Sequence, residues 1–191
     1  MINSPVFRSV HQALHLAYLM AVLPPTQKSP TATVINDLMD QAGVRREIER
    51  DGTVNFAGLS PLEVRGQCAM VIGAVRHQLQ PAERYAIEAW YAHSASKADA
   101  VHWLRDWCAP HWTIEAPAAR TLITWHVNLP EDVHNRLGCS ERLIGGEHGL
   151  PKSTVHDQIV KIRKAVTTLR RHGIDQLEWM FADKGLIGEA A

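Results

Sequence analysis

Cysteine is scarce in this chain, and its copies are too far apart to form a covalent or metal-binding framework. The three cysteines, Cys68, Cys108 and Cys139, include no CxxC pair. An odd and widely spaced set argues against a disulfide scaffold and fits a reducing compartment, so we expect a cytoplasmic protein. Each thiol is predicted to be a small buried hydrophobe.

Long hydrophobic runs are also missing. The most apolar stretch, residues 14–23, is too short to span a bilayer. Only Arg8 supplies positive charge just before it, and no small-residue cleavage pattern follows it. We therefore expect neither a signal peptide nor a membrane partner, and we predict that this stretch is the buried face of an N-terminal helix.

The sequence lacks the short motifs that mark common active sites. GxSxG, Walker A, HExxH and GxGxxG are all absent, and no nucleophile arrangement assembles locally, so we predict neither an enzyme nor a cofactor. Zinc ligand types occur at His102, Cys108 and His111. A structural zinc site needs four ligands, and only Cys108 and His111 have suitable spacing. The sequence thus favours scattered histidines and a buried thiol, with no metal.

No excess of one charge sign is present. Twenty basic and twenty acidic residues balance, so no overall field attracts DNA or an anionic membrane. The balance is uneven along the chain, because residues 140–172 hold seven Lys or Arg against three Asp or Glu, a net charge of about +4. Any affinity for nucleic acid is therefore predicted to be local to this segment.

Helical periodicity, in contrast, is present almost everywhere. Apolar residues recur at steps of three and four, and no alternating strand or Asn-Gly hairpin occurs, which predicts an all-α protein. Ser-Pro pairs at 4–5 and 60–61 predict two helix starts, and a further helix is predicted over residues 33–42. We expect three regions: an N-terminal helical segment at 1–58, a central helical core at 59–138, and a C-terminal region at 139–191.

Two parts of the central region carry further predictions. Residues 81–93 predict an amphipathic helix in which we expect Tyr85, Ala86, Ala89 and Trp90 to face inward and Glu83, Arg84 and Glu88 to face outward. Four of the six tryptophans lie in residues 94–138. Aromatic rings can stack on single-stranded bases, but few basic residues are interleaved here, so core packing is favoured.

The stretch GLPKSTVHDQIVKIRKAVTTLRR, residues 149–171, carries the sharpest pattern. Its apolar positions recur at steps of four, three, four and three, so one stripe faces a core: Val155, Ile159, Ile162, Val166 and Leu169. Residues 140–144 predict a short helix, followed by Gly145, Gly146 and a turn over residues 147–150. A short helix, a glycine-containing turn and a second helix form a helix-turn-helix, although an ordinary amphipathic surface helix is the alternative.

The residues off this stripe are the candidate DNA contacts. Residues 152–164 would enter the major groove, with Lys152 near the start of the helix. Long basic side chains suit phosphates: Arg142, Lys161, Arg163 and Lys164. Shorter polar side chains suit base edges: Ser153, Thr154, His156, Asp157 and Gln158.

A family resemblance supports these predictions. The stretch SERLIGGEHGLPKSTVHDQIVKIRKAVTTLRR resembles the helix-turn-helix of sigma-factor region four, and LQPAERYAIEAWYA is similar to the first helix of that region, with Glu83, Arg84 and Tyr91 at matching places. Together with the all-α pattern, these stretches resemble phage-encoded late-gene transcription regulators, including antiterminators of the Q type. The resemblance implies a sequence-specific regulator that binds promoter-proximal double-stranded DNA and contacts bacterial RNA polymerase in the host cytoplasm.

Other functions stay open at this point. A phage assembly or packaging adaptor could use the basic helix to dock on another protein, and a repressor or activator could recognise a promoter alone. A homo-oligomer is also open, because a single helix-turn-helix usually gains specificity through dimerisation or a second protein.

Overall fold

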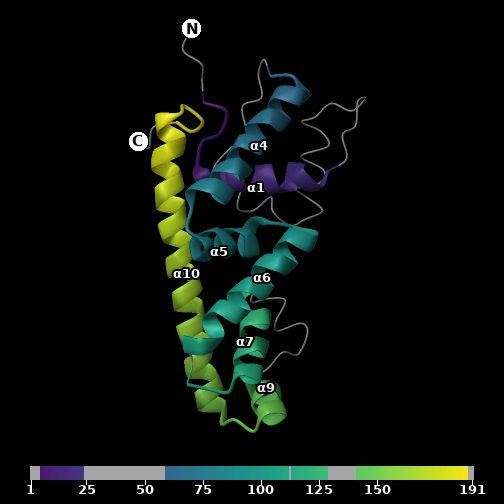
Figure 1. Ribbon diagram of the computed structural model, residues 1–191, viewed down its shortest axis with the longest axis vertical. Helices are drawn as coiled ribbons and strands as arrows, with labels where there is room; N and C mark the ends of the chain where they lie inside the picture. The colour runs from purple at the N-terminus through teal and green to yellow at the C-terminus, as the bar shows by residue number, and fades with distance from the viewer. Residues whose placement is uncertain (1–4, 24–58, 112, 129–140, 189–191) are drawn as a thin grey trace. The chain divides into compact units, whose positions relative to one another are not determined.

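The computed structural model describes residues 5–23, 59–111, 113–128 and 141–188 (Figure 1). Within these ranges the protein is mostly helical and has no strand, so the all-α prediction is confirmed. The predicted helix over 33–42 lies outside the described residues. The elements, in chain order, are α1 (Val10–Val22), α4 (Pro61–Gln78), α5 (Pro81–Tyr91), α6 (Ser94–Cys108), a short 3-10 helix (Ala109–His111), α7 (Ala116–Asn128), α9 (Glu141–His148) and α10 (Lys152–Asp183).

Contacts between residues divide the chain into two compact units. One comprises residues 1–79 and 174–191, and the other comprises residues 80–173. This division differs from the predicted regions, because the segment from residue 141 to 173 shares a unit with α5, α6 and α7. A short helix pair buries too little apolar surface to form a core alone, which explains why it packs on neighbouring helices.

The helix starts follow local capping chemistry. At α4, Ser60 Oγ accepts from the Glu63 backbone N–H at 3.3 Å, and Glu63 Oε2 accepts from the Ser60 N–H at 2.7 Å. This reciprocal pair confirms the predicted start at residues 60–61, and its hydrogen bonds lower the pKa of Glu63. The predicted start at residues 4–5 is wrong, because α1 begins at Val10 and its cap is Ser9.

The C-terminal end of α10 is set by Gly185. This glycine has a φ of 65°, in the left-handed region, and its N–H donates to Ala182 O at 3.0 Å. The Leu186 N–H donates to Phe181 O at 2.8 Å, which completes a Schellman motif. The chain then turns back so that Phe7 N–H donates to Leu186 O at 3.1 Å. The helix therefore ends at this glycine turn.

Helix α5 differs from its predicted orientation. Glu83 and Glu88, which were expected to face outward, are 6% and 3% exposed, and Trp90, which was expected to face inward, is 43% exposed. The predicted inward orientation of Trp90 is therefore wrong, and so is the predicted outward orientation of Glu83 and Glu88. Hydropathy alone misassigned them, because a carboxylate can be buried when hydrogen-bond partners satisfy it.

Those partners are visible around α5. Glu83 Oε2 accepts from the Gln80 backbone N–H at 3.2 Å, and Glu83 Oε1 pairs with His172 Nδ1 of α10. Glu88 Oε1 accepts from Arg84 Nε at 3.3 Å. Each buried carboxylate thus has a donor.

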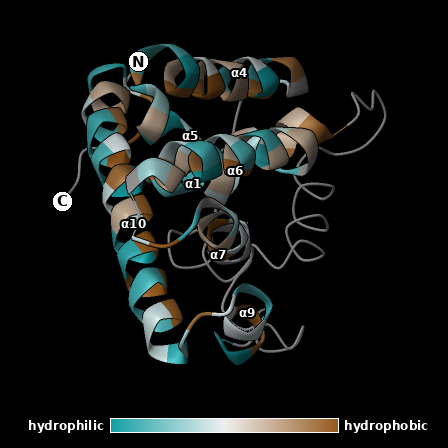
Figure 2. Ribbon diagram, turned by 60° about the horizontal axis from the view of Figure 1, so that its bottom comes forward, coloured by the Kyte–Doolittle hydropathy of each residue, from teal (hydrophilic) through white to brown (hydrophobic). Residues whose placement is uncertain are grey.

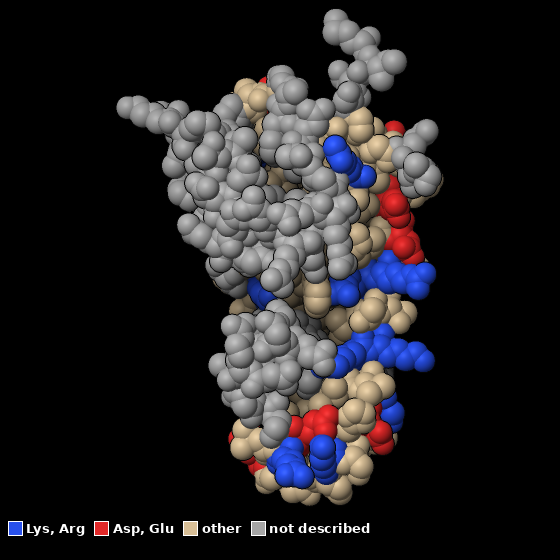
Figure 3. All heavy atoms as spheres, turned by 180° about the vertical axis from the view of Figure 1, so that it is seen from behind, with Lys and Arg blue, Asp and Glu red and all other residues tan. Residues whose placement is uncertain are grey.

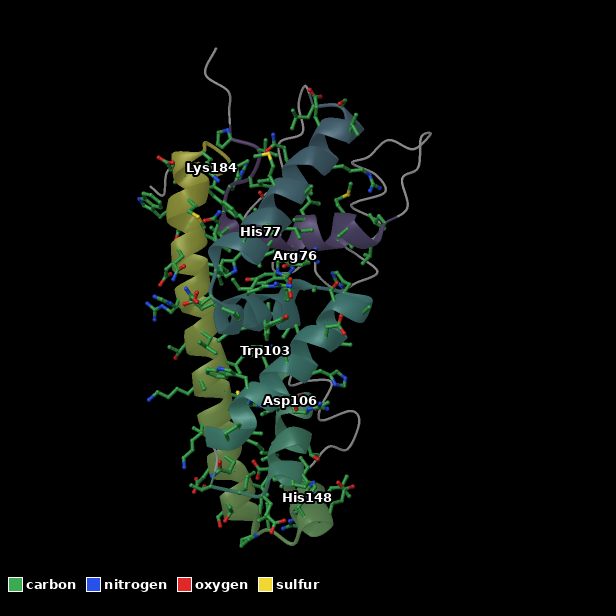
Figure 4. The ribbon with its side chains drawn as sticks, in the orientation of Figure 1. Arg76, His77, Trp103, Asp106, His148 and Lys184 are labelled. Atoms are coloured by element: carbon green, nitrogen blue, oxygen red, sulfur yellow. The ribbon has the colours of Figure 1, made fainter. Side chains whose placement is uncertain are left out.

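Aromatic side chains between α5 and α6 pack on one another. The Tyr85 and Trp103 rings stack with centroids 4.6 Å apart, and Trp103 lies 6.2 Å from Trp107 (Trp103 is labelled in Figure 4). Tyr85 and Trp103 also pack against the buried cluster of the second unit. This contact confirms the predicted packing role for Trp103, whereas Trp107 is 37% exposed.

Candidate nucleic-acid interface

Helices α9 and α10 are held to their unit by one apolar cluster. Ile144 of α9 and Val155, Ile159 and Ile162 of α10 are buried together with residues of α5, α6 and α7, such as Leu122. The side chains of Val166 and Leu169 are partly buried. The predicted apolar stripe is confirmed, and brown and teal segments alternate along α10 in Figure 2.

The connection between the two helices depends on two glycines. Gly149 has a φ of 63°, and the next residue, Leu150, donates its N–H to Gly145 O at 2.8 Å. A Cβ placed on Gly145 would lie 2.6 Å from Leu150 O, so the turn can close only over a glycine. The predicted helix end at Ile144 is wrong, since Gly145 and Gly146 lie inside α9, and the turn, predicted over residues 147–150, spans residues 149–151.

A second contact fixes the end of α9. His148 Nε2 lies 3.1 Å from Thr121 Oγ1 of α7, and His148 is labelled at the lower end of the molecule in Figure 4. With the tight turn and the buried Ile144, this hydrogen bond gives α9 contacts along its length. The start of α10 therefore follows a turn whose position is fixed by these contacts.

Most predicted contact residues lie on the surface of this segment. Thr154 is half-buried, and the exposed residues are Arg142 of α9 and Lys152, Ser153, His156, Asp157, Lys161, Arg163 and Lys164 of α10. In Figure 3, Lys and Arg side chains project from the edge that α10 forms and from the end where α9 and α10 meet. The structure therefore brings these side chains onto one continuous segment.

Gln158 is the exception, and its predicted contact with bases is wrong. Its side chain is 3% exposed, and its Nε2 donates to Thr113 Oγ1 at 2.8 Å. A buried amide that already has a partner cannot reach a base edge without losing that hydrogen bond. Gln158 instead joins α10 to the stretch that precedes α7.

Three charged or titratable side chains meet at the start of the segment. Glu141 Oε1 lies 2.8 Å from His156 Nδ1, and Glu141 Oε2 lies 3.7 Å from Lys152 Nζ. The hydrogen bond with His156 lowers the pKa of Glu141, and the charges of His156 and Lys152 act in the same direction. Glu141 therefore stays ionised at neutral pH and links α9 to two of the predicted contact residues.

Sequence reasoning missed two features of this surface. One is the role of Glu141, which no local spacing could show because its partner His156 lies fifteen residues further along the chain. The other is Val160, which is 52% exposed. The sequence did hold a signal for Val160, since it lies outside the three- and four-residue steps that define the apolar stripe.

The described residues contain neither a metal-binding cluster nor a membrane-spanning helix. In the part of the chain that the structure describes, no group of three or more His, Cys, Asp or Glu side chains could hold a metal ion. Cys108 is buried, and burial raises the pKa of its thiol to about 11, which disfavours the thiolate that binds zinc. The side chain of His111 lies outside the description. Among the described helices, none is both long and apolar enough to cross a membrane.

No protein family matches the chain, and no curated protein matches it in sequence.

Proposed function

We propose that α9, the turn at residues 149–151 and the start of α10 form a DNA-binding helix-turn-helix, and that the protein is a sequence-specific transcription regulator. The observation that carries this proposal is the two-sided start of α10. Val155, Ile159 and Ile162 anchor one side in the core, while the opposite side exposes polar and basic groups.

The exposed side has the spacing of a single helical face. Ser153, Asp157, Val160 and Lys164 follow one another at steps of four, three and four, so they point the same way. An α-helix with side chains is about 10–12 Å wide, and the major groove of B-DNA is about 12 Å wide. This face could therefore enter the groove while the apolar stripe stays in the protein.

The charges favour an anionic partner. The first turn of α10 contains no acidic residue, so the partial positive charge of the helix N-terminus is not neutralised within that turn. Exposed Lys161 and Arg163 flank this face, and Lys164 lies on it. Contacts of this kind position a protein on the phosphate backbone and make its affinity fall with salt.

The first test is binding of the full-length protein to a library of duplex DNA at two salt concentrations. Lys164→Ala should weaken binding to all sequences and reduce the magnitude of the slope of log affinity against log salt by about 1. Lys184→Ala removes an equally exposed lysine just beyond the far end of α10 and is the matched control. Failure of the wild-type protein to bind any DNA at low salt would overturn the proposal and favour protein docking.

The regulatory role is a further part of the proposal. The likeness of residues 140–171 and 79–92 to sigma region four, and of the chain to phage late-gene regulators, favours antitermination together with bacterial RNA polymerase. A transcription assay on a template with a terminator tests this role. Read-through that requires polymerase already engaged on DNA supports antitermination, whereas promoter blocking without read-through supports a repressor.

A further inference from the structure

His156 is the titratable side chain with the best-defined geometry on the exposed part of the segment. Its side chain is 60% exposed, yet its ring is not free to rotate without losing a bond, since Nδ1 lies 2.8 Å from Glu141 Oε1. Within the described residues, this carboxylate is the hydrogen-bond partner of the ring. Nε2, on the opposite side of the ring, is the nitrogen that a ligand can approach.

The carboxylate determines which nitrogen carries the proton. An ionised carboxylate only accepts hydrogen bonds, so the neutral imidazole must place its proton on Nδ1 to make this contact. Nε2 is then unprotonated and accepts hydrogen bonds. The neighbouring charges are Arg142 on α9 and Lys152 and Asp157 on α10, and Lys152 lies 3.7 Å from the other Glu141 oxygen, which further favours the ionised carboxylate.

The bases of DNA differ in what they offer to such an acceptor. In the major groove, adenine presents its N6 amino group and cytosine its N4 amino group, whereas guanine presents two acceptors and thymine one acceptor and a methyl group. An acceptor on the protein therefore separates the amino-bearing bases from the other two.

We propose that His156 Nε2 accepts a hydrogen bond from the exocyclic amine of adenine or cytosine, and that Glu141 is the positioning residue that fixes its tautomer. This inference rests on the proposed function, because it presumes that the start of α10 lies in the major groove. It assigns to Glu141 an effect on sequence preference although its charge repels phosphates.

A change of preference with pH follows from the same geometry. Protonation of the imidazole places a hydrogen on Nε2 while Nδ1 still donates to Glu141, so the acceptor becomes a donor. The preferred base at this position should then change from adenine or cytosine to guanine or thymine, which offer acceptors and no amino group in the major groove.

The experiment is selection of bound sequences from a randomised duplex library by the full-length protein at about pH 8 and about pH 5.5. At the higher pH, the wild-type protein should prefer adenine or cytosine at one position by about three- to tenfold, the range of one net hydrogen bond. His156→Ala should remove that preference at both pH values. His156→Gln should keep an adenine preference and lose the pH dependence, because an amide does not titrate.

Glu141→Gln separates positioning from charge. Loss of a negative charge should leave binding to unrelated DNA equal or tighter, while the preference at the His156 position falls by at least half. A purely structural role for Glu141 would instead weaken binding at every position. Lys161→Ala is the control that should weaken binding to all sequences without changing the preferred base.

The outcomes distinguish this inference from the proposed function. Failure of the wild-type protein to bind DNA at either pH overturns both. A selected motif that is identical at both pH values, or unchanged in His156→Ala, overturns the role of His156 and leaves the helix-turn-helix proposal standing. A motif unchanged in Glu141→Gln overturns the positioning role.

Discussion

The two parts of α10 share a periodicity and differ in charge. From residue 152 to 173 the helix carries six Lys or Arg and one Asp, whereas from residue 174 to 183 it carries three Asp or Glu and no Lys or Arg. Both parts bury an apolar stripe, with Ile162 in the first and Leu177 and Phe181 in the second. Along the α10 edge in Figure 3, basic side chains are followed by acidic ones.

The comparison separates what holds a helix in place from what it can bind. Burial of the stripe depends on spacing alone, so both parts are anchored in their own units in the same way. The exposed face depends on residue type, and only the first part offers the positive charge that phosphates attract.

The largest expected effect concerns the buried apolar stripe, which both parts of α10 share. Ile162→Ala and Leu177→Ala each remove a fully buried side chain, so each should lower the free energy of unfolding by about 2–5 kcal/mol. Urea denaturation of the full chain measures both. Val160→Ala, at an exposed position in the same helix, should change stability by less than about 0.5 kcal/mol. A small effect of Ile162→Ala would mean that the first part of α10 is not anchored by its stripe.

A smaller effect concerns the turn that precedes the basic part of α10. Gly145→Ala would place a Cβ 2.6 Å from Leu150 O, so we expect a loss of about 1–3 kcal/mol. Gly146→Ala meets no atom within 4 Å and should be stabilising by up to about 1 kcal/mol, because alanine favours the helix. Thermal unfolding of the two variants provides the measurement. Equal effects would contradict the close approach at Gly145.

The smallest effect separates burial from recognition within the basic part. Gln158→Ala removes one buried hydrogen bond to Thr113, so stability should fall by about 0.5–1.5 kcal/mol. The DNA sequence that the variant prefers should be unchanged, since the Gln158 side chain does not reach the surface. Denaturation and sequence selection on the same preparation test both points. An altered motif would show that Gln158 leaves its buried position when the protein binds DNA.

Much of the fold was predictable because its signals are local. The α4 start needed only Ser60, Pro61 and Glu63, and the stop at Gly185 needed a residue that accepts positive φ. The stripe of α10 was predictable for the same reason, since helical spacing is a property of neighbouring residues. Local propensity misled at Gly145 and Gly146, which both lie inside α9: Gly145 allows the close approach of Leu150 O, whereas Gly146 meets no atom within 4 Å.

The candidate site was predictable only in outline. Segment charge and spacing located the exposed residues of α10, but they placed Gln158 among the base contacts and gave no role to Glu141. Both errors arise from partners far along the chain, Thr113 for Gln158 and His156 for Glu141. The regulatory function and its polymerase partner stay predictions.

The sequence by itself determined that this protein is helical, where several of its helices begin and end, and which side of α10 is buried, because these properties follow from covalent geometry and residue spacing. Tertiary structure alone decided which polar side chains are satisfied internally and which stay available to a ligand. Glu83 and Gln158 are buried because partners from other segments, His172 and Thr113, compensate their desolvation. That compensation depends on distance in space, which spacing along the chain does not encode.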